Sequence, residues 1–318
     1  MLNRLLDSTA TPPYLPAMHF GAHCSTAGGL HRALERAAAI EAASCQIFVK
    51  NNMQWFGRPY QAADVAQFRA CLAQSKLRHV FGHAGYLINL AAASGDNRDK
   101  SLKSLIQEIE LATAIDLPFL VLHPGAHLAA GEKAGLNQVI AGLNEVIKIT
   151  KASRVRIALE NTAGQGSCLG CELTQFASVY DQVDHPERLG ICLDTAHLFA
   201  AGYDIRTGQG WEKTLQQLAA AVGLDQVVAF HLNDSKTELG SRIDRHEHIG
   251  RGKIGLEAFR HIVNDARFTA HPGCLETPKS DDLHEDISNL RLLRSLVDPP
   301  APERRPKRRR PASGSKGA

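Results

Sequence analysis

Short apolar runs alternate along the chain with longer stretches of mixed apolar and polar residues. Short apolar runs bounded by turn residues predict β-strands, and continuous apolar character is typical of strands that are buried on both faces of a parallel sheet. The predicted strands are Met18–Ala22, Cys45–Val49, His79–Gly82, Phe119–Leu122, Val155–Leu159, Gly190–Leu193, Val227–Phe230 and Gly273–Leu275.

The stretches between these runs predict helices. Leu102, Leu105 and Ile109, for example, recur at the spacing of one helical face. The predicted helices are Ala27–Ala43, Lys100–Ile115, Gln138–Lys151, Trp211–Val222 and Leu256–Asn264. Eight strands alternating with helices over about 280 residues predict an α/β fold, a (β/α)8 TIM barrel with its active site at the C-terminal mouth of the strands. An open, doubly wound sheet is the structural alternative.

Composition divides the chain into three parts. Residues 17–298 form the predicted TIM-barrel catalytic domain, residues 1–16 an N-terminal extension, and residues 299–318 a basic tail that we expect to be disordered. From Ala301 to Ala318 seven Lys/Arg face one acidic residue, so this segment carries +6. Subtracting that from the overall +3 leaves −3 for the rest, an unusual balance for a DNA-binding protein that relies on Lys and Arg alone.

Cysteine usage and hydropathy bear on the compartment. The seven cysteines are scattered, and an odd number predicts reduced thiols. The Cys168-x-x-Cys171 pair is interpreted as incidental, because a structural zinc site needs further ligands nearby. No apolar run has a membrane-spanning length and the N-terminus lacks the pattern of a signal peptide. We therefore expect a cytoplasmic protein, associated with the nucleoid if the source is bacterial.

The predicted strands share an unusual feature, which is that a potential metal ligand follows almost every one of them. In a TIM barrel the C-terminal strand ends meet at one mouth, so these side chains are predicted to share one space. So many carboxylates would repel one another without cations among them. Mixed imidazole and carboxylate ligands suit zinc, manganese or iron. The candidate ligands are His83, His123, Glu160, Asp194, His197, His231, Asp244, His246 and Glu276, and His23 also ends a strand.

Three local patterns resemble the endonuclease IV family of apurinic/apyrimidinic (AP) DNA repair enzymes, also called AP endonuclease family 2. They are H-A-G-Y-L-I-N-L-A from His83, G-I-C-L-D-T-A-H from Gly190 and H-L-N-D-S-K-T-E-L-G-S-R-I-D-R-H from His231. The segments G-A-H-C-S-T-A-G-G-L, L-E-N-T-A-G-Q-G and A-A-G-Y-D fit as well. The resemblance extends from about His19 to about Leu296.

The resemblance implies a barrel with three metal ions, usually zinc, with manganese possible at one or more positions. His83, His123 and Glu160 would hold the first ion. Glu160 would bridge to the second, and it is the residue to which the resemblance assigns the catalytic role. The second ion would be held by Glu160, Asp194, His231 and Glu276, and the third by His197, Asp244 and His246.

The resemblance also implies an activity and a partner. The family hydrolyses double-stranded DNA on the 5′ side of an abasic site in base excision repair, leaving a 3′-hydroxyl and a 5′-deoxyribose phosphate. Family members insert side chains from the loops after strands two and three into the DNA, which here implicates Asn51, Met53, Tyr86 and Leu87. Met53 departs from the arginine that is often found there. A monomer is plausible for an enzyme that wraps one bent duplex.

Two other functions are compatible with parts of the sequence. A single-metal sugar isomerase or epimerase on a related barrel could use Glu160, Asp194, His231 and Glu276, although the remaining ligand candidates argue against it. A non-catalytic protein could instead hold nucleic acid through its basic tail. The number of ions bound per chain separates the first alternative from the nuclease, and deletion of residues 301–318 tests the second.

Overall fold

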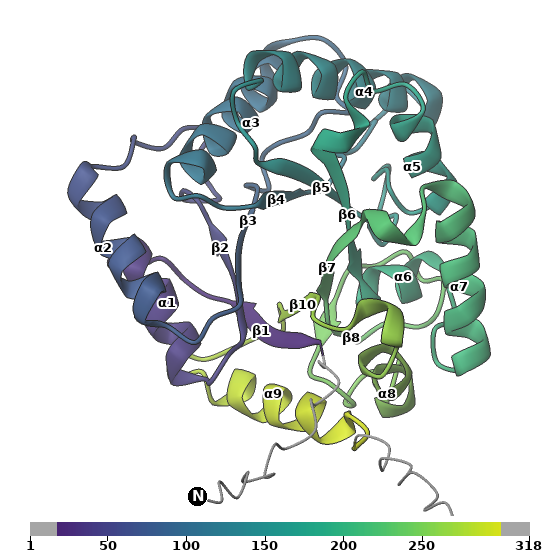
Figure 1. Ribbon diagram of the computed structural model, residues 1–318. Helices are drawn as coiled ribbons and strands as arrows, with labels where there is room; N and C mark the ends of the chain where they lie inside the picture. The colour runs from purple at the N-terminus through teal and green to yellow at the C-terminus, as the bar shows by residue number, and fades with distance from the viewer. Residues whose placement is uncertain (1–17, 300–318) are drawn as a thin grey trace, which may run out of the picture.

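Eight parallel strands close into a barrel in the computed structural model, which describes residues 18–299 (Figure 1). Neighbours around the barrel follow the order β1-β10-β7-β6-β5-β4-β3-β2. The predicted TIM barrel is confirmed and the open sheet is wrong. The barrel strands are β1 (His19–His23), β2 (Ser44–Phe48), β3 (His79–His83), β4 (Phe119–Leu122), β5 (Arg156–Glu160), β6 (Leu189–Asp194), β7 (Val227–His231) and β10 (Pro272–Leu275). The predictions for residues 1–16 and for most of the tail lie outside the described residues.

Helices form a ring around the strands (Figure 1). The α-helices are α1 (Leu30–Ala39), α2 (Ala62–Gln74), α3 (Asp96–Ala114), α4 (Glu132–Ile149), α5 (Leu173–Tyr180), α6 (Thr195–Ala201), α7 (Gly208–Ala221), α8 (Leu256–Val263) and α9 (His284–Leu296). Short 3-10 helices cover Pro186–Arg188, Leu224–Gln226 and Ala266–Phe268. The helices α2, α5, α6 and α9 were not among the predicted ones.

Differences in burial explain why some helices were easier to predict than others. Helix α3 places Leu102, Leu105 and Ile109 on one buried face, which gives a clear helical period. Helix α2 buries only Phe68 completely, so its sequence carries almost no periodic signal. Helix α2 is held in place mainly by its packing against α1.

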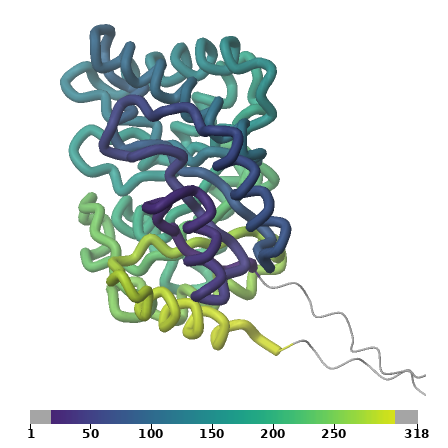
Figure 2. Tube along the Cα trace, turned by 90° about the vertical axis from the view of Figure 1, so that its left-hand side faces the viewer, coloured from purple at the N-terminus to yellow at the C-terminus, as the bar shows by residue number. Residues whose placement is uncertain are grey.

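The two ends of the described chain meet and complete the barrel. Strand β1 pairs with β10, with Phe20 opposite Gly273, and α9 packs against β1. Figures 1 and 2 show this closure from two directions, with the purple first strand beside the yellow last helix. The register of this pairing brings the end of β1 next to the end of β10, so that the predicted strand-end residues His23 and Glu276 lie close together.

The barrel interior is built in layers that follow the two-residue period of the strands. An apolar layer is made by Phe81, Phe119, Val121, Ala158, Cys192, Ala229 and Cys274. Phe81 and Phe119 stack within it at 4.7 Å between ring centroids. Side chains two residues further along a strand point to the same side. The layer above this floor is therefore occupied by the strand-end residues.

Two further expectations concern the cysteines and membranes. All seven cysteines are free thiols, with Cys168 half-buried and Cys171 buried. Among residues 18–299, no helix has both the length and the apolar character needed to cross a membrane.

Candidate metal centre at the barrel mouth

Each of six barrel strands carries a potential ligand two residues beyond an apolar floor residue. On β3, for instance, His83 follows Phe81, and on β5 Glu160 follows Ala158. The remaining four pairs are Val121 and His123, Cys192 and Asp194, Ala229 and His231, and Cys274 and Glu276. The two-residue period thus turns all six ligand candidates into the barrel mouth, directly above the buried apolar floor.

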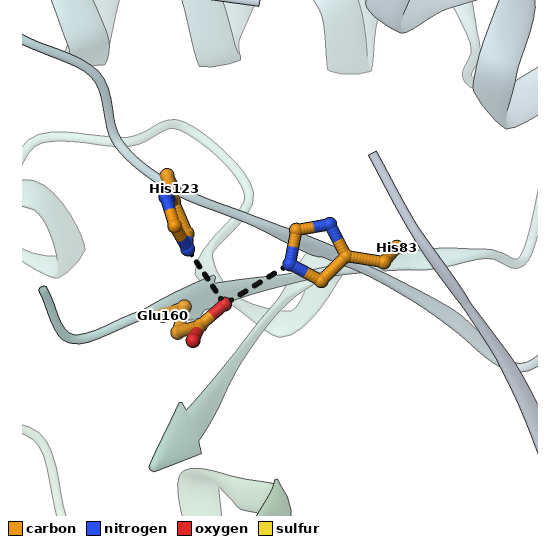
Figure 3. A group of neighbouring side chains, drawn as sticks. All are labelled: His83, His123 and Glu160. Carbon is orange, nitrogen blue, oxygen red and sulfur yellow. Dashed lines mark hydrogen bonds and ion pairs between the residues drawn. The ribbon is translucent and has the colours of Figure 1, made fainter. Parts of the chain in front are cut away.

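Glu160 lies at the centre of this group and is completely buried. Its Oε2 atom lies 3.2 Å from His83 Nε2 and 3.0 Å from His123 Nε2 (Figure 3). Its Oε1 atom lies 2.9 Å from His231 Nδ1. The two oxygens therefore face different sets of ligands, as a carboxylate that bridges two ions must.

A second group of ligand atoms surrounds Oε1 of Glu160. It consists of Glu160, Asp194, His231 and Glu276, whose ligand atoms all lie within 4.8 Å of one another. His231 Nδ1 lies 3.3 Å from Glu276 Oε2 and 3.8 Å from Asp194 Oδ2. The set matches the second ligand group that the resemblance implied.

A third group lies on the side of Asp194 and includes two residues from the long loop after β7. A two-stranded hairpin, β8 (Asp234–Ser235) with β9 (His246–Glu247), returns this loop to the mouth. Asp244 Oδ2 lies 3.2 Å from His197 Nε2, and Asp244 Oδ1 lies 3.3 Å from His246 Nε2. The ligand atoms of Asp194, His197 and His246 also lie within 4.8 Å of one another. The structure thus brings all nine candidate ligands together, with Asp194 next to the third group as well as in the second.

The start of α6 positions two of these ligands. Asp194 caps the helix, and its Oδ1 accepts a hydrogen bond from the backbone N–H of His197 at 2.8 Å. One turn therefore separates the cap residue from His197, which places both side chains on the same side. Asn233 donates to Asp194 Oδ2 at 2.7 Å and holds the carboxylate in place from the end of β7.

Backbone carbonyls orient three of the histidine rings. The Nδ1–H groups donate to the carbonyl oxygens of Ala84 for His83 (2.7 Å), Asn161 for His197 (2.9 Å) and Glu276 for His246 (3.3 Å). A carbonyl oxygen can only accept, so the proton is on Nδ1 and Nε2 is left with its lone pair. In His83 and His246 the other nitrogen, Nε2, faces the carboxylates. In His197 Nε2 faces Asp244, while Nδ1 also lies 3.2 Å from Glu160 Oε1.

The surrounding charges shift the pKa values of Glu160 and His197 in opposite directions. Burial alone would raise the pKa of Glu160, but the surrounding His231, His123 and His197 hold it well below its ordinary value. Burial alone would lower the pKa of His197, yet Asp194 and Asp244 raise it well above its ordinary value. The centre therefore demands positive charge, which either protons on the rings or metal cations can supply.

The residues of the centre fit divalent metal ions. Neutral imidazole and carboxylate donors converge in three groups, and cysteine is absent from them, which suits a catalytic rather than a purely structural ion. The buried Nε2 of His246 has no hydrogen-bond partner among the described residues. A buried acceptor atom without a partner costs free energy unless something else, such as an ion, binds its lone pair.

The predicted DNA-contact residues lie on the rim of the mouth. Met53 is 68% exposed and Tyr86 59% exposed. Asn51 is exposed and accepts a hydrogen bond from the backbone N–H of Met53, and Leu87 is half-buried. A cavity of about 560 Å³ next to the centre is lined by Asn51, Tyr86 and Glu276, among others. Tyr86 therefore stands between the rim and the ligands.

Helix α3 holds the loop that carries Met53. Ser104 donates to the carbonyl oxygen of Trp55 at 2.7 Å. One turn further on, Gln107 accepts from the backbone N–H of Gly57 and donates to its carbonyl oxygen. The loop is thereby fastened to a rigid helix at two consecutive points.

A buried ion pair joins this loop to the one that carries Tyr86. Lys50 Nζ lies 2.8 Å from Glu108 Oε1, and the two side chains are 4% and 1% exposed. Glu108 also accepts from the backbone N–H of Gly85, and Lys50 donates to the carbonyl oxygen of Gln54. Glu108 on α3 thus fixes the relative position of both loops.

Sequence reasoning missed the residues that support the ligands from behind. Gln46, Asn161, Asn233 and Asp234 are all buried polar side chains in contact with the ligands or with the ligand-bearing loop. Gln46 stands in an otherwise apolar strand segment, C-Q-I-F, and this exception to the pattern was a usable signal. Asp234 accepts backbone hydrogen bonds from Gly250, Gly252 and Ile254, which the sequence alone could not indicate.

The comparisons with known proteins agree with this geometry. The family described as xylose isomerase-like TIM barrel matches residues 34–296. A probable endonuclease 4 of Chloroflexus aurantiacus is 46% identical over 278 residues, covering 87% of this chain and 98% of that protein. This chain belongs to the endonuclease IV family. The resemblance that the sequence motifs indicated is confirmed.

Solved structures share the barrel of this chain. Endonuclease IV from Thermus thermophilus superposes with a TM-score of 0.77 at 35% identity, covering 87% of this chain and 98% of that one. A D-tagatose 3-epimerase-like protein superposes with a TM-score of 0.68 at 17% identity, covering 88% and 97%. The second likeness concerns the fold alone.

Proposed function

We propose that this protein is a zinc-dependent endonuclease that cuts DNA on the 5′ side of abasic sites, leaving a 3′-hydroxyl and a 5′-deoxyribose phosphate. As a member of the endonuclease IV family it is a DNA-cleaving hydrolase. The observation that carries the proposal is the convergence of nine imidazole and carboxylate ligands around Glu160. One ion needs only three or four protein ligands, so nine suit a cluster of ions.

We assign the ligands as the geometry groups them. His83, His123 and Glu160 would hold one ion, and Glu160, Asp194, His231 and Glu276 a second. His197, Asp244 and His246 would hold the third, with Asp194 adjacent. When bound, divalent ions lower the pKa of water towards neutrality and neutralise charge on the oxygens of a phosphodiester. Zinc is the best match to this donor set, and manganese is possible at one or more positions.

The chain's own side chains would position the reacting groups. Glu160 faces both ligand sets and keeps them in a fixed relation, because it is buried and its two oxygens are held separately. The apolar floor of Phe81, Ala158 and Cys192 excludes water from below. The scissile phosphate would enter from the open mouth, where His123 and Asp244 are partly exposed.

The rim would select double-stranded DNA with an abasic site. An abasic nucleotide lacks stacking, so it costs less to rotate out of the helix. Tyr86, Leu87 and Met53 would fill the gap left in the duplex, and Asn51 would hydrogen-bond its backbone. The apolar Met53 contributes no charge to the minor groove, so we expect weaker electrostatic binding than an arginine would give. We expect a monomer that acts on DNA in the cytoplasm.

The alternative function, a single-metal sugar isomerase or epimerase, is favoured only by the shared barrel. The Glu160, Asp194, His231 and Glu276 group would be sufficient for one ion. Five further ligands at the mouth would then have no purpose. Metal content decides between the two, since two or three ions per chain favour the nuclease and one ion favours the sugar enzyme.

The decisive experiment uses a labelled duplex with one central abasic-site analogue and an undamaged duplex of the same sequence. The metal-loaded protein should cut only the first, once, 5′ to the lesion, and leave a 3′-hydroxyl. Glu160→Gln and His123→Ala should abolish cleavage with little change in circular dichroism, whereas His185→Ala, at an exposed histidine, should cleave normally. A metal-loaded protein that leaves the lesion uncut rejects the proposal, and cleavage by both ligand variants rejects the site assignment.

A further inference from the structure

Gln46 is a completely buried polar side chain on β2, beneath the second ligand group. Its Nε2 atom lies 2.6 Å from Glu276 Oε1 and 2.9 Å from His23 Nδ1. Its Oε1 atom lies 2.7 Å from His231 Nε2. One carboxamide therefore contacts two ligands of the same group, and all of its hydrogen-bonding atoms face partners.

The chemistry of Glu276 determines which way this carboxamide points. A carboxylate only accepts hydrogen bonds, so the Gln46 atom that faces it must be the NH2 group. The other atom is then the carbonyl oxygen, which also only accepts. His231 Nε2 must therefore carry a proton and donate to Gln46. The second hydrogen of the NH2 group donates to His23 Nδ1, so every hydrogen-bonding atom of the Gln46 carboxamide has a partner.

We propose that Gln46 is a positioning residue that fixes the tautomer of His231 and thereby makes Nδ1 its metal-binding atom. An imidazole binds an ion only through a nitrogen without a proton. The Nδ1 atom lies 2.9 Å from Glu160 Oε1 and 3.3 Å from Glu276 Oε2, inside the second ligand group. The inference rests on the metal centre of the proposed function and adds which atom binds and what selects it.

His231 differs from the other oriented rings in this respect. His83, His197 and His246 donate through Nδ1 to backbone carbonyls and leave Nε2 free. His231 does the reverse, because its Nε2 meets a side chain. The hydrogen bond that orients the His231 ring can therefore be removed by substituting Gln46, whereas the hydrogen bonds to backbone carbonyls at the other rings cannot be removed in this way.

The tautomer can be measured directly in the zinc-loaded protein. Long-range proton–nitrogen correlation spectra of protein labelled with ¹⁵N-histidine distinguish protonated from metal-bound ring nitrogens. The His231 signals are assigned by their loss in His231→Gln. We expect a proton on Nε2 and zinc on Nδ1 for His231, and the opposite arrangement at His83. A proton on Nδ1 of His231 overturns the inference.

Gln46→Met tests the consequence for metal binding. Methionine keeps the length of the side chain and removes all three hydrogen bonds. Loss of a residue that orients ligands lowers metal affinity by about 10- to 100-fold, so competition with a chelator should show one weakened zinc position while the others are retained. The matched control is Ile47→Met, which introduces the same residue at a buried position on the outer face of the same strand.

The outcomes separate this inference from the proposed function. Equal zinc affinity in Gln46→Met and Ile47→Met overturns the role of Gln46. If Gln46→Met does not fold, the wild-type spectrum alone decides. A wild-type protein that binds no zinc overturns both the proposed metal centre and the inference, whereas zinc bound through Nε2 of His231 overturns the inference alone.

Discussion

The buried pair of Lys50 and Glu108 gives the sharpest prediction for stability. Both side chains are almost inaccessible to solvent and their charged atoms lie 2.8 Å apart. Lys50→Met keeps most of the side chain's apolar volume and removes the charge, leaving Glu108 buried with the Gly85 N–H as its donor, because the Ser104 hydroxyl donates to the Trp55 carbonyl. Removing one partner of a buried ion pair costs about 3–5 kcal/mol.

Protonation of Glu108 sets an upper limit to this cost. Burial already raises the pKa of Glu108, against the opposing effect of Lys50, and loss of Lys50 raises it further. Protonating a carboxyl with an unperturbed pKa of about 4.3 costs about 1.4 kcal/mol for each pH unit above that value. At pH 7 this cost is about 3.7 kcal/mol. When folding raises the pKa of a carboxyl, the folded protein loses stability as the pH rises. The stability penalty of Lys50→Met should therefore grow by up to about 1.4 kcal/mol per pH unit.

Equilibrium unfolding in urea, with saturating metal, measures the penalty against wild type at pH 5.5 and 7.5. We expect a loss of about 3 kcal/mol at the higher pH and a smaller loss at the lower one. Lys100→Met is the matched control, because Lys100 forms an exposed pair with Asp96 on the same helix and its loss should cost less than about 1 kcal/mol. The double variant Lys50→Met/Glu108→Gln removes both charges and should recover most of the stability. A penalty for Lys50→Met that equals the control, or that does not change with pH, refutes the reasoning.

Three further predictions concern metal, DNA and acid. Removing metal with a chelator should lower Tm by about 8 °C if one ion is present at a thousand times its Kd, and calorimetry that shows no shift would contradict a metal centre. Met53→Arg should make the slope of log K against log[salt] for duplex binding steeper by about 0.9, which fluorescence anisotropy measures; an unchanged slope removes Met53 from the interface. His19 Nδ1 lies 2.8 Å from His79 Nε2. Burial lowers the pKa of both rings; the charge of Arg78 lowers that of His19 further, and the charge of His19 lowers that of His79 further. Folding therefore disfavours their protonation, so stability should fall as pH drops below about 6.5, and His79→Gln should flatten the fall in Tm.

The location of the predicted site followed from two local regularities of the sequence. Apolar runs placed the strands to within a residue or two, and the residue after every run except Cys45–Val49 was of ligand type. In a parallel barrel all strands end at the same mouth, so strand-end residues must share a space whatever the details of packing. The candidates His83, His123, Glu160 and His231 could be grouped on that basis before any distance was known.

Helix boundaries were less predictable, because they depend on what each helix packs against. The weakly periodic α2 and the short α5 and α6 are held by contacts with neighbours rather than by strong periodicity of their own. The hairpin that returns Asp244 and His246 to the mouth is likewise invisible to local patterns. Its place depends on Asp234, whose buried carboxylate gathers backbone N–H groups from the following loop.

What the sequence by itself determined is the barrel, its mouth and the chemical type of the ligands, since each depends on periods of two or about four residues along the chain. Only the tertiary structure decided which atom faces which. Gln46 meets His231 across 185 residues and Glu276 across 230, and Lys50 meets Glu108 under two separate loops. Such contacts arise when the closed barrel brings distant strands into register, and hydrogen bonds and buried charges depend on distances that no local pattern specifies.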